Sequence, residues 1–156
     1  FIKTIKNLLA ATGLPPANLQ LEITENTYIE NQMIVNNLLK DLQKIGVKFS
    51  IDDFGTGFSS IGYLKNFSVD TLKIDKNFID DLLRSEKDLQ IARTIILVAD
   101  SLGMDAVAEG IENHEQLRTL RSLGCKFGQG HYLSKAVSAS EFEALINRSR
   151  ENCLEA

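Results

Sequence analysis

The sequence predicts an α/β fold of the TIM type, an incomplete (β/α) barrel of about five parallel strand–helix units with one helix before them. Stretches in which apolar residues recur at every second position, as in strands, alternate along the chain with stretches in which they recur about every 3.6 positions, as in helices. A polar side chain stands at or near the end of each strand stretch. Strict strand–helix alternation implies a parallel sheet with right-handed crossovers, and polar groups at its carboxyl edge are typical of barrel active sites.

The first helix and the first strand are predicted within residues 1–24. Residues 2–9 place their apolar side chains on one helical face, and Gly13 followed by two prolines ends that helix. Residues 19–24 then alternate apolar and polar side chains, as a strand with one buried face does.

The second strand, 47–52, ends in adjacent carboxylates and is the most informative stretch of the chain. The helix before it has apolar residues between 35 and 45 and ends at Gly46. Gly55 and Gly57 permit a tight loop directly after Asp52 and Asp53. A serine at 59 or 60 then caps a predicted helix bearing Ile61, Leu64 and Phe67.

Three further strands complete the predicted order, at residues 71–75, 105–111 and 127–133. A polar connection with one short apolar turn follows the first of these, and a long helix then runs to Gly103. Asn113 and Gln116 have the spacing of a capping box before the next helix, and Ser138 with Glu141 caps the last one.

Composition predicts one globular domain spanning residues 1–156. The chain is 44% hydrophobic and 24% charged, and its net charge of −4 leaves no basic face for duplex nucleic acid. Two cysteines, Cys125 and Cys153, are too few for a disulfide framework, which favours a reducing, cytoplasmic location. No apolar run has membrane-spanning length. The start at Phe1 leads us to expect a longer parent protein, which could be membrane-tethered.

One polar side chain per predicted strand is expected on the sheet face opposite the helices. Taken singly, each has an ordinary explanation, such as an exposed acid or a lysine at a strand edge. Small neighbours predict that Glu109 is in a tight, buried place and that Gln129 is similarly enclosed. Taken together the five favour a site at the barrel rim: Glu22, Asp52, Lys73, Glu109 and Gln129.

Five segments resemble, in order and spacing, the signature segments of the EAL family of bacterial cyclic-di-GMP phosphodiesterases. They are 21–25 (LEITE), 51–60 (IDDFGTGFSS), 72–75 (LKID), 108–112 (AEGIE) and 128–130 (GQG). The resemblance implies a modified TIM barrel with two Mg²⁺ or Mn²⁺ ions at its rim. There an activated water cleaves one phosphodiester of cyclic di-GMP and releases linear pGpG.

The resemblance also implies a role for each matching residue. Glu22, Asp52 and Asp53 would bind metal, Lys73 would hold the attacking water, and Glu109 would support the second metal or act as base. Gln129 and Asp75 would contact substrate. The loop after Asp53 would couple the site to a homodimer interface beside the following helix. The residues that would support this loop are Glu25, Gly55, Thr56 and Gly57. Sensory or GGDEF domains upstream are common in such proteins.

The chain departs from the family pattern in two places. The Glu-Ala-Leu tripeptide of the first barrel strand and an asparagine metal ligand of the third are missing, so strands four to eight are expected here. A TIM barrel typically takes about 250 residues. We therefore expect the 156-residue chain alone to be inactive and to expose two sheet edges. Lys135-Ala136 also stands where the family usually has a proline after the last strand.

Two alternatives stay open at the level of sequence. A non-catalytic cyclic-di-GMP receptor would bind the nucleotide without turnover. A phospho-acceptor receiver domain also joins an acidic pair at a strand end to a later lysine, but it requires the acidic pair on its first strand, whereas a strand precedes Asp52 here.

Overall fold

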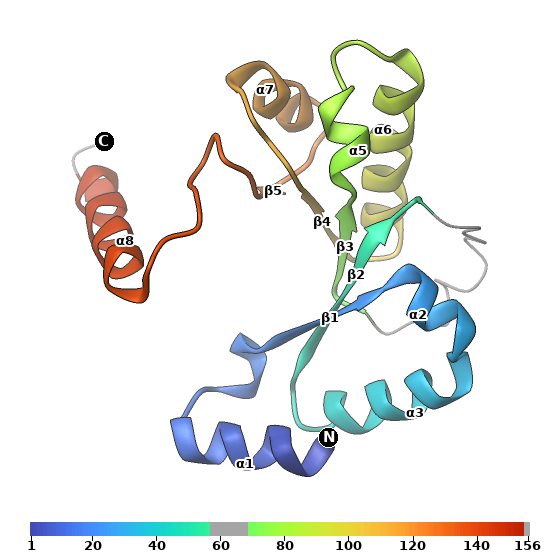
Figure 1. The fold of residues 1–156 in the computed structure, drawn as a ribbon, viewed down its shortest axis with the longest axis vertical. Helices are drawn as coiled ribbons and strands as arrows, with labels where there is room; N and C mark the ends of the chain where they lie inside the picture. The colour runs from blue at the N-terminus through green and yellow to red at the C-terminus, as the bar shows by residue number, and fades with distance from the viewer. Residues whose placement is uncertain (57–68, 155–156) are drawn as a thin grey trace.

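A parallel five-stranded sheet forms the centre of the computed structural model, which describes residues 1–56 and 69–154 (Figure 1). The strands lie in chain order, β1-β2-β3-β4-β5. Their bounds are β1 Gln20–Thr24, β2 Lys48–Phe54, β3 Thr71–Ile74, β4 Asp105–Ala108 and β5 Phe127–Gly128. Sequential order is that of a barrel wall and confirms the predicted fold. A receiver-type sheet has the order 2-1-3-4-5, so that alternative is wrong.

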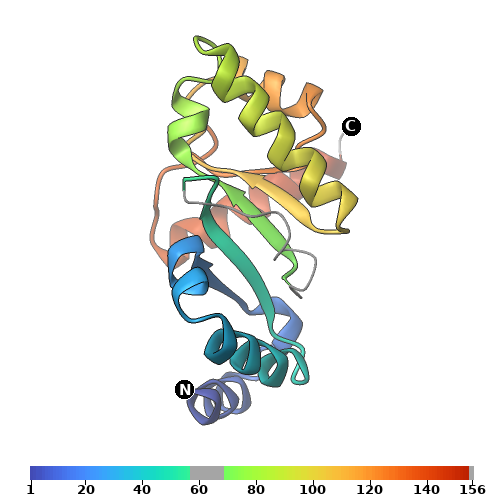
Figure 2. The same cartoon turned by 90° about the vertical axis from the view of Figure 1, so that its right-hand side faces the viewer.

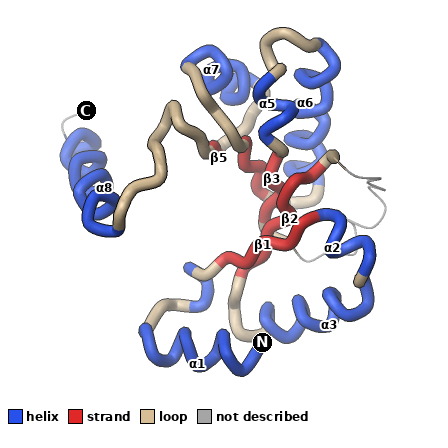
Figure 3. The backbone as a smooth tube through the Cα atoms, in the orientation of Figure 1, coloured by secondary structure: helices blue, strands red, loops and turns tan. Residues whose placement is uncertain are grey.

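The helices between successive strands cover one side of the sheet, whereas α1 precedes β1 and α8 follows β5 and lies away from the sheet (Figures 1 and 3). Figure 2, which looks at the structure from that side, shows α3 and α6 in front of the sheet and α8 beyond it. The helical elements are α1 Ile2–Thr12, the 3₁₀ turn η1 Pro16–Asn18, α2 Glu25–Glu30, α3 Gln32–Gln43, α5 Lys76–Asp80, α6 Glu86–Ser101, α7 His114–Ser122 and α8 Ala139–Leu154.

The core lies between the sheet and these helices. Phe49 and Ile51 of β2 and Leu72 and Ile74 of β3 are almost completely buried there. Helix α6 buries a face made of Ala92, Ile95, Ile96 and Ala99. In the strands this is the face that the period-2 pattern predicts, because side-chain direction follows directly from that period. The buried face of α6 differs from the one that the sequence predicts, which is Ile91, Ile95, Val98 and Leu102: Ile95 is common to both, whereas Ile91 and Leu102 are each 37% exposed.

The strand and helix bounds differ from the sequence prediction in three places. β4 and β5 stop at Ala108 and Gly128, so Glu109 and Gln129 lie on loops just past their strands. α2 is an additional helix, capped by the Thr24 side chain, which accepts from the backbone N–H of Thr27. The helix predicted after Ser59 lies outside the described residues. The capping box of α7 is confirmed.

Strands β1 and β5 are the two edges of the sheet, since each pairs with one neighbour only among the described residues. Unpaired strand edges recruit other strands. We expect the isolated 156-residue chain to self-associate, and multi-angle light scattering over a concentration series measures this. A monomer at all concentrations would contradict the expectation.

No helix within residues 1–56 and 69–154 has both the length and the apolar character needed to cross a bilayer.

Candidate functional site

A buried lysine at the carboxyl edge of the sheet holds three carboxylates from neighbouring parts of the sheet. Lys73 Nζ lies 2.8 Å from Glu22 Oε2, 2.9 Å from Asp52 Oδ1 and 2.8 Å from Glu109 Oε1. The Lys73 side chain is 8% exposed, whereas that of Glu22 is 50% exposed. The structure therefore brings together four of the five predicted rim residues, which lie on β1, β2, β3 and directly after β4.

Lys73 carries its charge at neutral pH. Burial opposes that charge, but the close contacts with the carboxylates of Glu109, Glu22 and Asp52 outweigh it and raise the pKa of Lys73 above its usual value. Burial also raises the pKa of Glu109, and Lys73 opposes this shift. Because one ammonium faces three carboxylates, the group keeps excess negative charge that a cation would neutralise.

Asp52 and Asp53 both face the site because β2 is irregular where they lie. Ile51 pairs with Leu72 and Phe54 pairs with Ile74, so three residue steps on β2 face two on β3. Consecutive side chains of a regular strand point to opposite faces. The extra residue, together with the positive φ of 54° at Asp53, turns both carboxylates toward the same edge.

Oxygen atoms of Asp52, Asp53 and Glu109 lie within 4.8 Å of one another and fit a divalent cation. A set of carboxylate oxygens suits Mg²⁺ or Mn²⁺. Asp52 Oδ1 is buried and makes no hydrogen bond, because its 2.9 Å contact with Lys73 lacks hydrogen-bond alignment. Burial raises the pKa of the Asp53 carboxyl group, and the neighbouring carboxyl groups of Asp52 and Asp75 raise it further. Glu22, predicted as a ligand, lies outside this close group and reaches it through Lys73.

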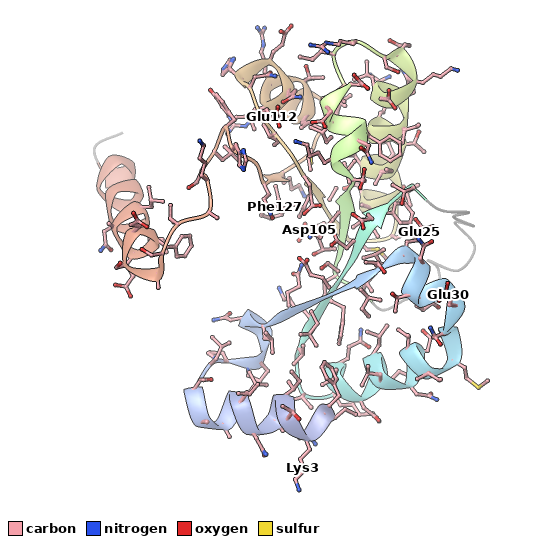
Figure 4. All side chains as sticks on the ribbon, viewed as in Figure 1. Lys3, Glu25, Glu30, Asp105, Glu112 and Phe127 are labelled. Carbon is pink, nitrogen blue, oxygen red and sulfur yellow. The ribbon has the colours of Figure 1, made fainter. Side chains whose placement is uncertain are left out.

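A buried carboxylate on α2, that of Glu25, holds the turn that follows β2. Glu25 is 2% exposed, and its Oε2 accepts a hydrogen bond from the backbone N–H of Gly55 at 3.1 Å (Figure 4). Gly55 has a φ of 99°, which favours glycine. The Thr56 hydroxyl donates to the Asp53 carbonyl at 2.8 Å. These contacts agree with a supporting role for Glu25, Gly55 and Thr56; Gly57 lies outside the described residues.

Replacing Glu25 with alanine should destabilise the protein by about 1–3 kcal/mol, because the Gly55 N–H loses its buried acceptor. Urea unfolding measures the change, and a lower midpoint is expected. Glu30→Ala on the same helix is the control, because Glu30 is exposed and its loss should change stability by less than about 0.5 kcal/mol. Equal midpoints for the two variants would contradict the supporting role.

Of the two residues predicted to contact substrate, Asp75 lies beside Asp53, whose pKa it raises, and Gln129 lies directly after β5. Asp75 is mostly buried and caps α5, accepting from the backbone N–H of Asn77 at 2.8 Å. Gln129 lines a rim cavity of about 380 Å³ together with Lys76, Glu112 and His131. Contrary to the prediction of an enclosed amide, Gln129 is exposed, because it follows the edge strand β5.

Lys76, Glu112 and Gln116 are rim residues to which the sequence patterns assign no place in the site. Lys76 Nζ lies 2.6 Å from Glu112 Oε1 and 3.5 Å from Asp80 Oδ1. Gln116 is signalled only as a helix cap, by its spacing from Asn113, and Lys76 and Glu112 only adjoin the segments containing Asp75 and Glu109. The pairing of Lys76 with Glu112 joins residues 36 positions apart, which no local pattern predicts.

Comparison with known proteins identifies the family. The protein-family model of the EAL domain matches residues 1–136 of this chain. The cyclic di-GMP phosphodiesterase NbdA of Pseudomonas aeruginosa is 38% identical over 149 residues, 96% of this chain and 19% of NbdA. The chain spans about a fifth of the length of curated relatives that it matches.

Solved structures agree with this match. The PaMucR phosphodiesterase in complex with c-di-GMP is 37% identical, with a TM-score of 0.87 over 90% of this chain and 57% of that one. Klebsiella pneumoniae BlrP1, in a manganese and cyclic-di-GMP complex, is 32% identical, with a TM-score of 0.78 over 83% of this chain and 33% of that one. The fold, the site geometry and the sequence match agree: this chain belongs to the EAL domain family.

Proposed function

We propose that this protein is a metal-dependent phosphodiesterase that hydrolyses one phosphodiester of cyclic di-GMP to give linear pGpG. The observation that carries the proposal is the buried Lys73, surrounded by three carboxylates, beside a cluster of carboxylate oxygens. Similarity to proteins named as cyclic di-GMP phosphodiesterases, or solved with that nucleotide, supports the choice of substrate.

Asp52, Asp53 and Glu109 would hold a divalent cation, Mg²⁺ or Mn²⁺, and Glu22 would join them if Lys73 released it. A second ion, as the family resemblance implies, would need ligands beyond these. When bound, such ions make water nucleophilic at neutral pH and neutralise charge on the phosphoryl oxygens.

Lys73 and Glu109 divide the proton chemistry between them. The charged Lys73 ammonium has no lone pair at neutral pH, so it acts as a donor that orients the attacking water and stabilises developing negative charge. As the alternative to its role as a metal ligand, Glu109 would accept the water proton at a carboxylate oxygen. Glu22 and Asp52 hold the ammonium in place.

Several broader features belong to the same proposal. Residues 1–156 would form the last five strand–helix units of the barrel, and the Glu-Ala-Leu glutamate and the asparagine ligand would come from the preceding units. Asp75 and Gln129 would contact the nucleotide. We also expect a cytoplasmic location, a homodimer through the loop and helix after Asp53, and a sensory or GGDEF domain upstream.

The test is hydrolysis of cyclic di-GMP by the protein at its full natural length, followed by chromatography of pGpG. Activity should require Mg²⁺ or Mn²⁺, disappear with EDTA and return with added metal. The 156-residue chain alone should form no pGpG. Nucleotide binding without turnover by the full-length protein would instead identify the non-catalytic receptor.

A further inference from the structure

Gln116 is a buried polar residue that makes more contacts than a helix cap requires. It is 4% exposed and stands in the first turn of α7. Its Oε1 accepts from the backbone N–H groups of Glu112 and Asn113, at 2.8 and 3.2 Å, and its Nε2 donates to the Ile79 carbonyl at 2.8 Å. The capping box uses only the bond from the Asn113 N–H to Gln116 Oε1 and the bond from the Gln116 backbone N–H to Asn113 Oδ1.

The other two bonds of Gln116 join the segments that leave β3 and β4 at the rim. The loop 109–113 follows β4 and begins with Glu109, whereas α5 follows β3, on which Lys73 lies. Ile79 belongs to α5 and Glu112 to the loop, so one side-chain amide bonds to both segments.

A second contact joins the same two segments nearer the strands. The Lys76 side chain of α5 crosses over Gly110, where a Cβ would overlap it, and pairs with Glu112 (Figure 4 labels Glu112). Both Lys76 and Glu112 are about half exposed. Because exposed ion pairs stabilise little, the buried Gln116 amide is the stronger of the two connections.

We propose that Gln116 is a positioning residue that fixes the loop 109–113 against α5 and thereby holds the Glu109 carboxylate beside Lys73 and Asp52. Backbone bonds hold the first part of the loop: the Glu109 N–H donates to the Ile74 carbonyl at 3.2 Å, the Ile111 N–H donates to the Gln129 carbonyl at 3.1 Å, and the Ile111 carbonyl accepts from the Tyr132 N–H at 3.0 Å. The far end of the loop depends on Gln116, whose Oε1 accepts from two loop N–H groups and whose Nε2 connects it to α5, so without Gln116 we expect this end to shift and to alter the separation between Glu109 and Asp52. Residues that orient metal ligands commonly affect metal affinity.

Two variants of Gln116 and one matched control test the proposal in the protein at its full natural length. Gln116→Met keeps the side-chain length and removes every side-chain hydrogen bond. Gln116→Glu keeps an acceptor for the two loop N–H groups; measured at a pH that ionises it, it places an oxygen without a proton against the Ile79 carbonyl, so the connection to α5 is lost and a charge is buried. Asn113→Ala removes the helix-capping bond and leaves the three bonds of the Gln116 side chain intact.

Mn²⁺ affinity by calorimetry and cyclic-di-GMP turnover are measured for each variant at equal folded fraction. Both Gln116 variants should bind Mn²⁺ about 10–100-fold more weakly and lose kcat by a similar factor, with KM nearly unchanged. Asn113→Ala should lower the melting temperature but leave Mn²⁺ affinity as in the wild type. Equal Mn²⁺ affinities in Asn113→Ala and Gln116→Met would show that Gln116 acts only as a helix cap, and this would overturn the proposal.

Three further outcomes are also decisive. If Gln116→Met does not fold, Gln116→Glu decides, and wild-type Mn²⁺ affinity in that variant overturns the proposal. The kcat measurement rests on the proposed function, but the Mn²⁺ measurement does not. A wild-type protein that binds Mn²⁺ without hydrolysing cyclic di-GMP would refute the phosphodiesterase and leave the role of Gln116 to be judged on metal affinity. A wild type that binds no Mn²⁺ refutes both.

Discussion

Replacing Lys73 with methionine is expected to lower the rate of cyclic-di-GMP hydrolysis by roughly 10²–10⁴-fold, the range for loss of a positioned proton donor or acceptor. The variant removes the ammonium that contacts Glu22, Asp52 and Glu109. Since Lys73 lowers the pKa of Glu109, its loss lets burial raise that pKa further and keeps Glu109 protonated to higher pH. A protonated Glu109 cannot accept a proton from water.

The same variant gives a second signal without substrate. Three carboxylates without their shared cation repel one another, so metal-free Lys73→Met should melt below the wild type, and Mn²⁺ should raise its melting temperature. Lys44→Met is the control, because Lys44 makes an ion pair of the same 2.8 Å length with Asp41 but is 75% exposed. Hydrolysis by Lys73→Met at the rate of Lys44→Met would exclude Lys73 from the mechanism.

Asp52→Asn is expected to abolish tight Mn²⁺ binding. The loss of affinity should exceed the factor of about 10–100 that is typical when a residue that only orients a metal ligand is replaced. The substitution preserves shape and removes the charge from a carboxylate whose buried Oδ1 makes no hydrogen bond. It also leaves Lys73 with two carboxylates, Glu22 and Glu109, at 2.8 Å each. The metal-free variant should therefore be at least as stable as the wild type.

Opposite effects on stability and on metal affinity separate a metal ligand from a structural acid. Calorimetric titration with Mn²⁺ gives the affinity, and thermal unfolding with and without Mn²⁺ gives the stability. In the wild type Mn²⁺ should raise the melting temperature, whereas in Asp52→Asn it should not. Asp41→Asn, at an exposed ion pair outside the site, should behave like the wild type. If Asp52→Asn melts lower without metal and still binds Mn²⁺, Asp52 is a structural acid.

The order of the elements and the core-facing side of each strand follow from the sequence, because side-chain direction is set by the local period. Phe49 and Ile51 alternate with polar neighbours and are buried as predicted. The capping box of α7 is equally local, because Asn113 and Gln116 stand three positions apart. The rim residues on β1 to β3 and just after β4 could be named for the same reason.

Strand register and long-range hydrogen bonds are the parts that local patterns leave undetermined. Gln116 is predicted as a cap, but its bond to Ile79 joins residues 37 positions apart. Likewise, Gln129 stands between two glycines in the sequence yet is exposed, since exposure depends on which strand, if any, lies beyond β5.

By itself the sequence determined the α/β barrel wall, the order of its elements and the residue types at its carboxyl edge, because each depends on neighbours a few positions away. Only the tertiary structure decided that Lys73 contacts three carboxylates at once and that Asp52 and Asp53 face the same edge. The first depends on the register of four strands, and the second on the extra residue that β2 carries opposite β3. Register is set by packing between segments far apart in the chain, so no single strand encodes it.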